Sequence, residues 1–379
     1  MSRPHPDKRL FTPGPLTTSR TVKEAMLHDA SSRDEDFIEL VRDIRRRLLA
    51  LAGVGPDAGF EAILMQGSGT FAVEAVLSTA LPRDGKLLVL VNGAYGERMV
   101  EMARRHQIGH HVLTWEEDTP VDPDQTRQAL AENPSLTHVA VVQCETTSGI
   151  LNPVDVVGRV VREAGRQYII DAMSSFGVLP ADLTQTDYLI SSANKCIEGV
   201  PGFAFVLARR TSLEGTRGQA RTLSLDLYDQ WRGLESNGQF RFTPPTHAIL
   251  AFAQALDELD AEGGPKARLA RYRNNQQVLS EGMQNLGFTP YLAPAVQAPI
   301  ITTFRQPGHP RFDFTRFHQE LSRRGFVIYP GKLTREPCFR IGNIGRLDEG
   351  DMHALLAVIR EVLDVLQIEA PIHSPSQSA

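Results

Sequence analysis

The chain has 379 residues, of which 41% are hydrophobic and 22% charged, as is usual for a globular enzyme with two unequal domains. Its net charge of −5 argues against a nucleic-acid-binding surface spread over the whole protein. No apolar run approaches the roughly 20 residues that span a bilayer, and the polar N-terminus lacks a signal-peptide core. The three cysteines lie far apart, so we expect no metal site, no disulfide framework and a cytoplasmic location.

Short apolar, β-branched runs alternate with amphipathic stretches between about residues 60 and 210. Seven runs predict strands, at residues 62–65, 87–91, 111–115, 138–143, 168–170, 188–191 and 203–208. Helical spacing of apolar residues, as at 153–164, predicts helices between several of them. This alternation is typical of an α/β fold whose mostly parallel sheet has helices on both faces. Ligands of such sheets bind beyond the carboxyl ends of the strands, so the polar residues there are the candidates for chemistry.

The remainder of the chain predicts a different organisation. Residues 215–246 are rich in Gly, Arg and polar side chains and favour an irregular excursion, after which a helix is expected at 247–261. Beyond Gly263, helices mix with strands expected at 300–304, 326–329 and 338–341. We therefore expect four parts: an N-terminal arm (1–20), a large domain (21–260), a smaller C-terminal α+β domain (261–368) and a Pro- and Ser-rich tail (369–379), which we expect to be disordered.

A glycine turn, Gln66-Gly-Ser-Gly-Thr70, follows the first predicted strand of the sheet and precedes a helical stretch at 71–79. The start of a helix presents free backbone N–H groups and a positive dipole end, which suit a phosphate. Ser68 and Thr70 add hydroxyl donors. A simple helix cap with flexible glycines is the alternative, and the lysine of a P-loop is missing.

Asp171 directly follows the strand at 168–170. A carboxylate in such a buried place is costly to keep ionised unless it meets a cation. The protonated nitrogen of a pyridine ring is one such partner, and enzymes that use pyridoxal 5′-phosphate (PLP) place an Asp there. A helix cap or a metal-binding Asp remains the alternative.

Lys195 follows the strand at 188–191 and precedes a glycine-rich turn. Desolvation in such a place lowers the pKa of a lysine and leaves more free amine to attack a carbonyl. The chain has only six lysines, and four of the others lie in polar or helical contexts. Lys332 is the one rival, although a loop or lid lysine is the simpler interpretation of that position.

Three further residues fit a site for a flat anionic cofactor and an anionic substrate. Tyr95 follows a strand and could stack on a ring, or could belong to the core or an interface. Thr146 follows another strand and offers a hydroxyl near a ring, or a cap for the next helix. Arg340 lies inside an apolar strand, where a guanidinium needs an anion such as a carboxylate or phosphonate, or a structural salt bridge.

Taken together, these motifs resemble those of the class V, fold-type I PLP-dependent aminotransferases, which include alanine–glyoxylate and serine–pyruvate enzymes. The resemblance covers nearly the whole chain. Its most specific parts are Phe11-Thr-Pro-Gly-Pro-Leu-Thr-Thr18 and Asp171-Ala-Met-Ser-Ser-Phe-Gly177, with Lys195-Cys-Ile-Glu-Gly-Val-Pro-Gly202 beyond them. It is closest to the branch that transfers the amino group of 2-aminoethylphosphonate to pyruvate, which gives phosphonoacetaldehyde and L-alanine.

The resemblance implies a role for each candidate residue. Lys195 holds PLP as a Schiff base and carries the proton, and Asp171 pairs with the pyridine nitrogen. Tyr95 stacks on the ring, with Thr146 near its edge, and Arg340 binds the substrate anion. The cofactor phosphate is bound by Ser68, Gly69 and Thr70, together with Thr243 from the partner subunit. The family fold implies a homodimer with active sites at the subunit interface, and no nucleic acid or membrane as a partner.

The sequence departs from the family pattern at four positions. Ala30 and Arg33 lie where tryptophans are usual, Phe240 replaces a Trp, and Asn194 replaces a small residue before the lysine. These changes leave the exact amino donor open, or are surface substitutions without consequence. Alternatives for the whole protein are an alanine–glyoxylate or serine–pyruvate aminotransferase, a PLP-dependent phosphonate lyase, and a non-catalytic PLP-binding dimer.

Overall fold

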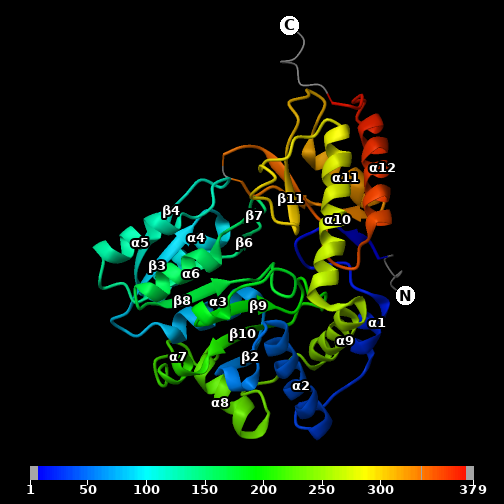
Figure 1. The fold of residues 1–379 in the computed structure, drawn as a ribbon. Coiled ribbons are helices and arrows are strands. Elements are labelled where there is room, and N and C mark those ends of the chain that lie inside the picture. Colours follow the sequence, from blue (N-terminus) through cyan, green and yellow to red (C-terminus); the bar gives the residue numbers. More distant parts are fainter. Residues whose placement is uncertain (1–6, 334, 373–379) are drawn as a thin grey trace.

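The computed structural model describes residues 7–333 and 335–372 (Figure 1). Its centre is a seven-stranded sheet in the order β2-β10-β9-β8-β5-β3-β4. The strands are β2 (Phe60–Gln66), β3 (Lys86–Val91), β4 (Gly109–Thr114), β5 (His138–Val142), β8 (Gln167–Asp171), β9 (Tyr188–Ser192) and β10 (Phe203–Arg209). Only β10 runs antiparallel to its neighbours, β9 and β2. The expected mostly parallel sheet is confirmed, and each predicted strand overlaps one observed strand.

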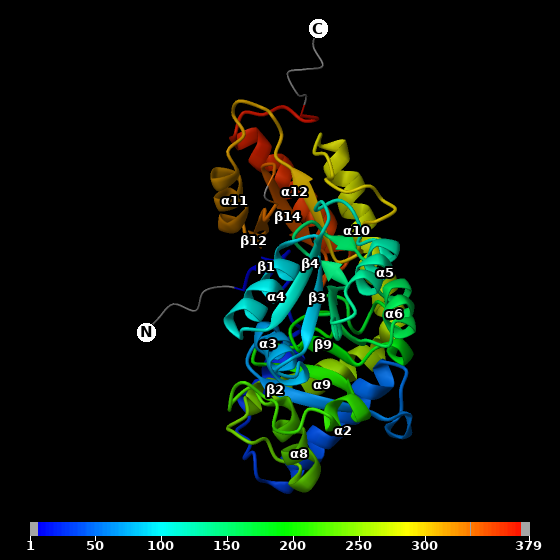
Figure 2. The same cartoon turned by 90° about the vertical axis from the view of Figure 1, so that its left-hand side faces the viewer.

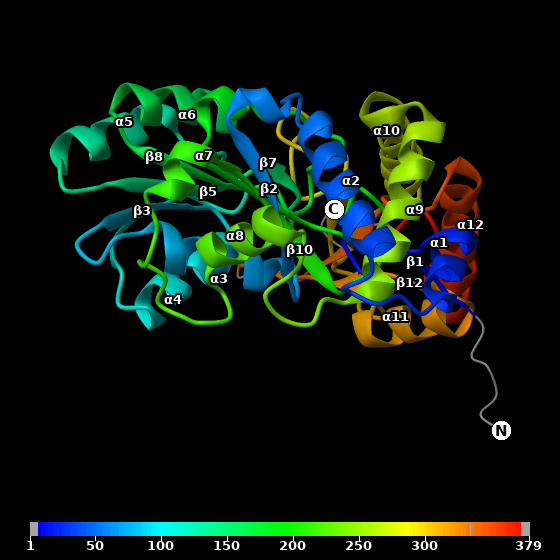
Figure 3. The same cartoon turned by 90° about the horizontal axis from the view of Figure 1, so that it is seen from below.

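Helices cover both faces of this sheet, which explains why its central strands are apolar throughout. Figure 3 shows α3 and α4 on one face and α5 and α6 on the other. The helices of this part are α1 (Arg20–Glu24), α2 (Glu35–Leu51), α3 (Gly69–Ala80), α4 (Ala94–Arg105), α5 (Pro123–Glu132), α6 (Val154–Glu163), α7 (Arg210–Glu214), α8 (Leu227–Asn237) and α9 (Thr246–Glu262). None of the helices within residues 7–333 and 335–372 is both long and apolar enough to cross a membrane.

The expectation of an irregular excursion at 215–246 is wrong for helix α8. Its apolar residues Leu227, Trp231 and Leu234 recur at helical spacing and are buried. Asp226 caps the first turn by accepting a hydrogen bond from the N–H of Asp229, and Gly238 ends the helix in the left-handed conformation. The glycines and arginines that suggested a loop lie away from this apolar stripe, either elsewhere on helix α8 or outside the helix.

The C-terminal part has its own core, drawn in yellow to red at the top of Figure 1. Strands β11 (Ile301–Arg305), β14 (Cys338–Gly342) and β13 (Tyr329–Pro330) form a three-stranded sheet. Helices α10 (Gly264–Asn285), α11 (Phe314–Arg323) and α12 (Glu349–Val365) pack with it around buried phenylalanines and leucines. The expected strand at 326–329 is in fact two short strands, because β12 (Phe326–Val327) pairs with β1 and only β13 pairs with β14.

The N-terminal arm lies against this C-terminal part. Strand β1 (Arg9–Leu10) pairs in parallel with β12, and the two lie side by side in Figure 2. At the other end of the chain, Ile372 is buried and its N–H donates to the carbonyl of Leu286. The start of the tail that we expected to be disordered is therefore packed, and residues 373–379 lie outside the described part. The hairpin β6 (Cys144–Glu145) and β7 (Ile150–Leu151) completes the strands of the described residues.

Candidate active site

The carboxyl ends of five strands meet at one edge of the central sheet. Strands β2, β3, β5, β8 and β9 all run in the same direction, because β10 is antiparallel to both β2 and β9. Six of the predicted site residues line one cavity of about 180 Å³ at this edge: Ser68, Gly69, Thr70, Tyr95, Asp171 and Lys195. This is where a ligand is expected in an open sheet of this kind.

The glycine turn forms the start of helix α3, as its spacing predicted. Ser68 is the N-cap residue of this helix, and its hydroxyl makes no hydrogen bond to the helix. The first turn bonds instead through the carbonyl of Ser68, which accepts from the N–H groups of Phe71 and Ala72. The hydroxyl of Ser68 and the leading N–H groups are thus available to an anion. A Cβ on Gly69 would lie 2.1 Å from the sulfur of Met173, so a larger residue requires that side chain to move.

Asp171 is the last residue of β8 and its side chain is 5% exposed. Burial raises the pKa of Asp171 to about 7, although the N–H of Met173, which donates to Oδ1 at 2.9 Å, acts in the opposite direction. A carboxyl group with such a pKa gains free energy by pairing with a cation. A protonated pyridine nitrogen in the cavity would supply that charge.

Lys195 lies beside the N-terminal arm. Its Nζ donates to the carbonyl of Pro13 at 2.6 Å, and a Cβ on Gly14 would lie 2.6 Å from the same nitrogen. Burial lowers the pKa of Lys195, and the nearby Tyr95 and Asp171 raise it to a smaller extent. The arm therefore contacts the amine of the lysine directly, a contact that sequence spacing could not reveal.

Tyr95, Thr146 and Arg340 form one corner of the site. The guanidinium of Arg340 is buried and donates to the carbonyl of Thr146 at 2.7 Å. The hydroxyl of Tyr95 lies close to Thr146 and to Arg340. Burial lowers the pKa of Arg340 below its usual value. Burial also raises the pKa of Tyr95, but this effect is outweighed by the hydrogen bond from Thr146 and by neighbouring cations, so that the pKa is lowered overall.

Thr243 does not reach this cavity in its own chain. It is exposed, beside Phe242, whose carbonyl accepts from Gln66 Nε2 at 2.8 Å. Of the four departures from the family pattern, only Asn194 lines the cavity, where its Oδ1 accepts from Ser192 at 3.2 Å. The other three, Ala30, Arg33 and Phe240, lie away from the cavity lining.

Sequence reasoning missed two charged residues of the site. Arg98, one turn after Tyr95 on α4, donates to Thr70 Oγ1 at 3.0 Å and stacks 4.8 Å from the centre of the Tyr95 ring. Glu145 is fully buried and accepts from the N–H groups of Tyr95 and Gly96, so it caps the start of α4. The helical spacing of Tyr95 and Arg98 was a visible signal, whereas the contact of Glu145 joins residues about 50 positions apart.

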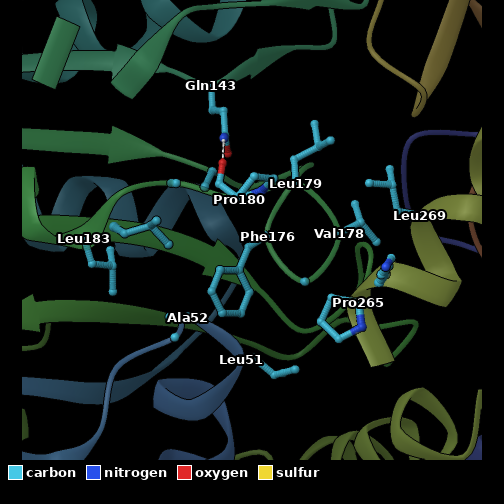
Figure 4. A pocket seen from close by; sticks show the side chains of 16 residues that line it. Leu51, Ala52, Gln143, Phe176, Val178, Leu179, Pro180, Leu183, Pro265 and Leu269 are labelled. Atoms are coloured by element: carbon cyan, nitrogen blue, oxygen red, sulfur yellow. Dashed lines mark hydrogen bonds between the residues drawn. The ribbon is translucent and has the colours of Figure 1, made fainter. Parts of the chain in front are cut away.

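A second cavity, of about 370 Å³, lies beside the segment that follows Asp171 (Figure 4). Its walls are mainly apolar, from side chains such as Leu51, Phe176 and Leu269. The amide of Gln143 is already occupied there, because it bonds the carbonyl of Pro180 and the hydroxyl of Ser175. None of the residues that line this cavity carries a hydroxyl, and Lys266 is its only basic side chain. The smaller cavity at the strand ends is therefore the candidate for the cofactor.

Comparison with known proteins identifies the family. Residues 19–354 match the model of the class V aminotransferases, and the chain belongs to that family and is an aminotransferase. A 2-aminoethylphosphonate–pyruvate transaminase of Syntrophobacter fumaroxidans is 54% identical over 93% of this chain and 96% of its own length. An enzyme of the same name from Klebsiella pneumoniae is 52% identical over 92% of this chain and 96% of its own length.

Solved structures show the same fold. The pyridoxamine–pyruvate aminotransferase of Mesorhizobium loti superimposes with a TM-score of 0.87 at 22% identity, covering 97% of this chain and 95% of that one. The alanine–glyoxylate aminotransferase of Nostoc sp. gives 0.88 at 23% identity, covering 96% and 97%. At these identities the likeness supports the fold, which is that of the fold-type I PLP-dependent transferases.

The cofactor of this family is PLP, and the residues of the cavity fit it. Three observations match three of its polar groups. The free hydroxyl of Ser68 at the start of α3 suits the phosphate, and the buried carboxyl of Asp171 suits a protonated ring nitrogen. Lys195, whose pKa is lowered by burial, presents an amine to the aldehyde. Arg98 would add a positive charge beside the phosphate.

Proposed function

We propose that the enzyme transfers the amino group of 2-aminoethylphosphonate, or of a close aminoalkylphosphonate, to pyruvate, with phosphonoacetaldehyde and L-alanine as products. The observation that carries this proposal is the 52–54% identity over more than nine-tenths of the chain to enzymes of that name. The buried guanidinium of Arg340 agrees with it. Within the described residues, Arg340 forms no ion pair with a carboxylate, so its charge is available to a substrate anion.

Each residue of the site has a separate role in this reaction. PLP supplies an aldehyde that condenses with amines and a ring that stores the electron pair released when a proton leaves the substrate. Ser68, Gly69 and Thr70 hold the phosphate, and Asp171 keeps the ring nitrogen protonated. Lys195 would hold the cofactor through its Nζ, and the same amine would accept and return the proton of the substrate carbon. Arg340 orients the substrate by its anionic end.

Half-reactions of the holoenzyme with single amino donors test this assignment. 2-Aminoethylphosphonate is expected to change the absorbance of the bound cofactor, and pyruvate to restore it. If alanine or serine does this while 2-aminoethylphosphonate leaves the spectrum unchanged, an alanine–glyoxylate or serine–pyruvate activity replaces our assignment. Release of ammonia without a need for pyruvate indicates a lyase.

The role of Lys195 is tested by its own substitution. Lys195→Ala is expected to lower the rate of the half-reaction by about 10³-fold or more, because proton transfer by a positioned side chain contributes up to about 10⁴-fold. Lys266→Ala, which changes a lysine outside the cavity, is the matched control. A Lys195→Ala enzyme that turns over at the wild-type rate would exclude the mechanism.

The proposal includes a homodimer in which Thr243 of the partner subunit reaches the phosphate. Exposed apolar side chains gather near the glycine turn: Phe71 is 51% exposed and Phe242 is 45% exposed. Leu223 is 74% exposed, and its carbonyl accepts from Arg241, which precedes Phe242. Such a patch is characteristic of a protein interface. Phe242→Glu is expected to produce monomers in light scattering and to weaken PLP binding, whereas Val156→Glu, on an exposed position elsewhere, leaves both unchanged.

The division into an arm, a large domain, a small domain and a tail is part of the same proposal, as is a cytoplasmic location. The separate cores around the central sheet and around α10–α12 support the division. Limited proteolysis tests it, with cleavage expected first outside these cores. Cell fractionation tests the location.

A further inference from the structure

A second cation lies in the corner of the site that holds Arg340. Lys332 is in the turn between β13 and β14, and its Nζ is 4.2 Å from the centre of the Tyr95 ring. Arg340 is on β14, and its guanidinium lies close to the hydroxyl of the same tyrosine. One hairpin therefore brings two positive side chains to Tyr95.

Both charges lack a carboxylate partner among residues 7–333 and 335–372. The hydrogen bonds of Arg340 go to backbone carbonyls, those of Thr146 at 2.7 Å and Pro330 at 3.0 Å. Lys332 forms no ion pair in this part of the chain, whereas Arg335, three residues further on, pairs with Glu116. Two cations held together without an anion repel one another, so the arrangement is favourable only when an anion of matching charge enters.

We propose that Lys332 and Arg340 together bind the two negative charges of the phosphonate group, and that Lys332 selects the dianionic amino donor. The inference rests on the proposed function and deepens it. Arg340, with its planar fork, suits any carboxylate or phosphonate, so it serves both the donor and pyruvate. Lys332 supplies a compact second positive charge, and only a doubly charged anion can pair with both cations. Pyruvate carries a single charge and needs Arg340 alone.

Anions that cannot react separate charge from shape. Ethylphosphonate is a dianion in mildly alkaline solution, whereas ethanesulfonate has the same tetrahedral shape and a single charge. Neither has an amine, so their binding to the holoenzyme is measured by calorimetry without turnover. The variants are Lys332→Gln and Lys332→Arg. The matched control is Lys86→Gln, which changes an exposed lysine at the opposite end of β3.

We expect Lys332→Gln to weaken ethylphosphonate about tenfold, the loss of one hydrogen-bonded charge pair, and to change ethanesulfonate little. Lys332→Arg keeps most of the preference for the dianion, and Lys86→Gln keeps all of it. In turnover, Lys332→Gln raises the KM for 2-aminoethylphosphonate about tenfold and leaves the KM for pyruvate nearly unchanged.

If Lys332→Gln weakens the binding of both anions equally, or raises both KM values equally, the proposal is overturned. Lys332 would then not distinguish a dianion from a monoanion. The same holds if Lys332→Gln changes neither anion. Failure of the proposed function looks different: the wild-type enzyme would react with alanine or serine and leave 2-aminoethylphosphonate untouched, whatever the anion affinities of the variants.

Discussion

The guanidinium of Arg271 lies 2.7 Å from the carboxylate of Glu198 and ties helix α10 to the chain three residues after Lys195. Glu198 has a φ of 66°, in the left-handed region that side chains other than glycine rarely adopt. Its carboxylate also accepts from the hydroxyl of Tyr272. Arg271 donates in addition to the carbonyls of Gly345 and Leu347. A buried charge network thus connects the segment that carries Lys195 to the C-terminal part of the chain.

Loss of the charge of Glu198 is expected to destabilise the fold strongly. Glu198→Gln would leave Glu262 to compensate both Arg271 and the fully buried Arg268, and the loss of a hydrogen bond to a charged group costs about 1.5–3 kcal/mol. The free energy of unfolding in urea measures this loss. Glu214→Gln, on an exposed position, is the control and should lie within about 0.5 kcal/mol of wild type. A loss for Glu198→Gln no larger than that of the control contradicts the role of the network.

The stability of the enzyme without PLP should depend on Asp171 and pH. The pKa of about 7 in the folded chain exceeds the ordinary 3.8. The folded apoprotein therefore keeps a proton that the unfolded chain releases between about pH 4 and 7, and stability falls as the pH rises through this window. Asp171→Asn removes that penalty. We expect the variant apoprotein to melt at a higher Tm than wild type at pH 8, and at pH 5 the difference in Tm should be smaller.

The same substitution should have the opposite effect on the holoenzyme. Asn cannot pair with a protonated ring nitrogen, so PLP should raise the Tm of Asp171→Asn less than it raises that of wild type. Asp84→Asn, on an exposed position, controls for a general change in surface charge. If the difference in Tm between the wild-type and Asp171→Asn apoproteins is the same at pH 5 and pH 8, the raised pKa of Asp171 is excluded.

A methyl group on Gly69 should obstruct the phosphate site. The added Cβ would lie 2.1 Å from the Met173 sulfur, and crowding of this kind costs about 1–3 kcal/mol. Gly69→Ala is therefore expected to weaken PLP about tenfold or more in a titration followed by cofactor absorbance. Gly308→Ala is the control, because a Cβ there meets open space.

A second substitution tests whether the clash is the cause. Shortening the neighbour in Gly69→Ala/Met173→Ala should recover a large part of the lost affinity. If the double variant binds PLP no better than Gly69→Ala alone, the contact with Met173 is not what makes glycine necessary, and the flexibility of the turn would account for it instead.

The sequence predicted the strands of the central sheet because each is a continuous apolar run between turn residues. It also placed Ser68, Asp171 and Lys195 at strand ends, and the parallel arrangement brings those ends together. Helix α8 escaped prediction because glycine and arginine in residues 215–246 hid a regular apolar stripe. The pairing of β12 with β1 could not be predicted, since it joins segments more than 300 residues apart.

The contacts that position the side chains of the site could not be predicted either, because they join residues that are far apart in the sequence. Glu145 caps the helix of Tyr95, and the carbonyl of Pro13 accepts from Lys195 across an interval of 182 residues. No local pattern marks a carbonyl as the partner of a particular lysine. The resemblance to a family pointed to the Pro-Gly-Pro arm as a specific motif, and the structure supplies the physical reason for it.

The arm gives the last prediction. Gly14 has a φ of 121°, and a Cβ there would lie 2.6 Å from Lys195 Nζ. Gly14→Ala should therefore displace the lysine amine or the arm and reduce the fraction of cofactor linked to the lysine. Borohydride reduction followed by mass spectrometry measures that fraction, since only linked PLP becomes permanently attached.

Gly218→Ala separates this contact from backbone strain. Gly218 also has a positive φ, of 74°, but a Cβ at that position meets nothing within 4 Å. The strain is of the order of 1 kcal/mol for Gly218→Ala and about 1–3 kcal/mol for Gly14→Ala, so both substitutions should lower the Tm. Only Gly14→Ala should also reduce the linked fraction and the rate of the half-reaction. Equal behaviour of the two variants would mean that the arm acts through stability alone and does not position Lys195.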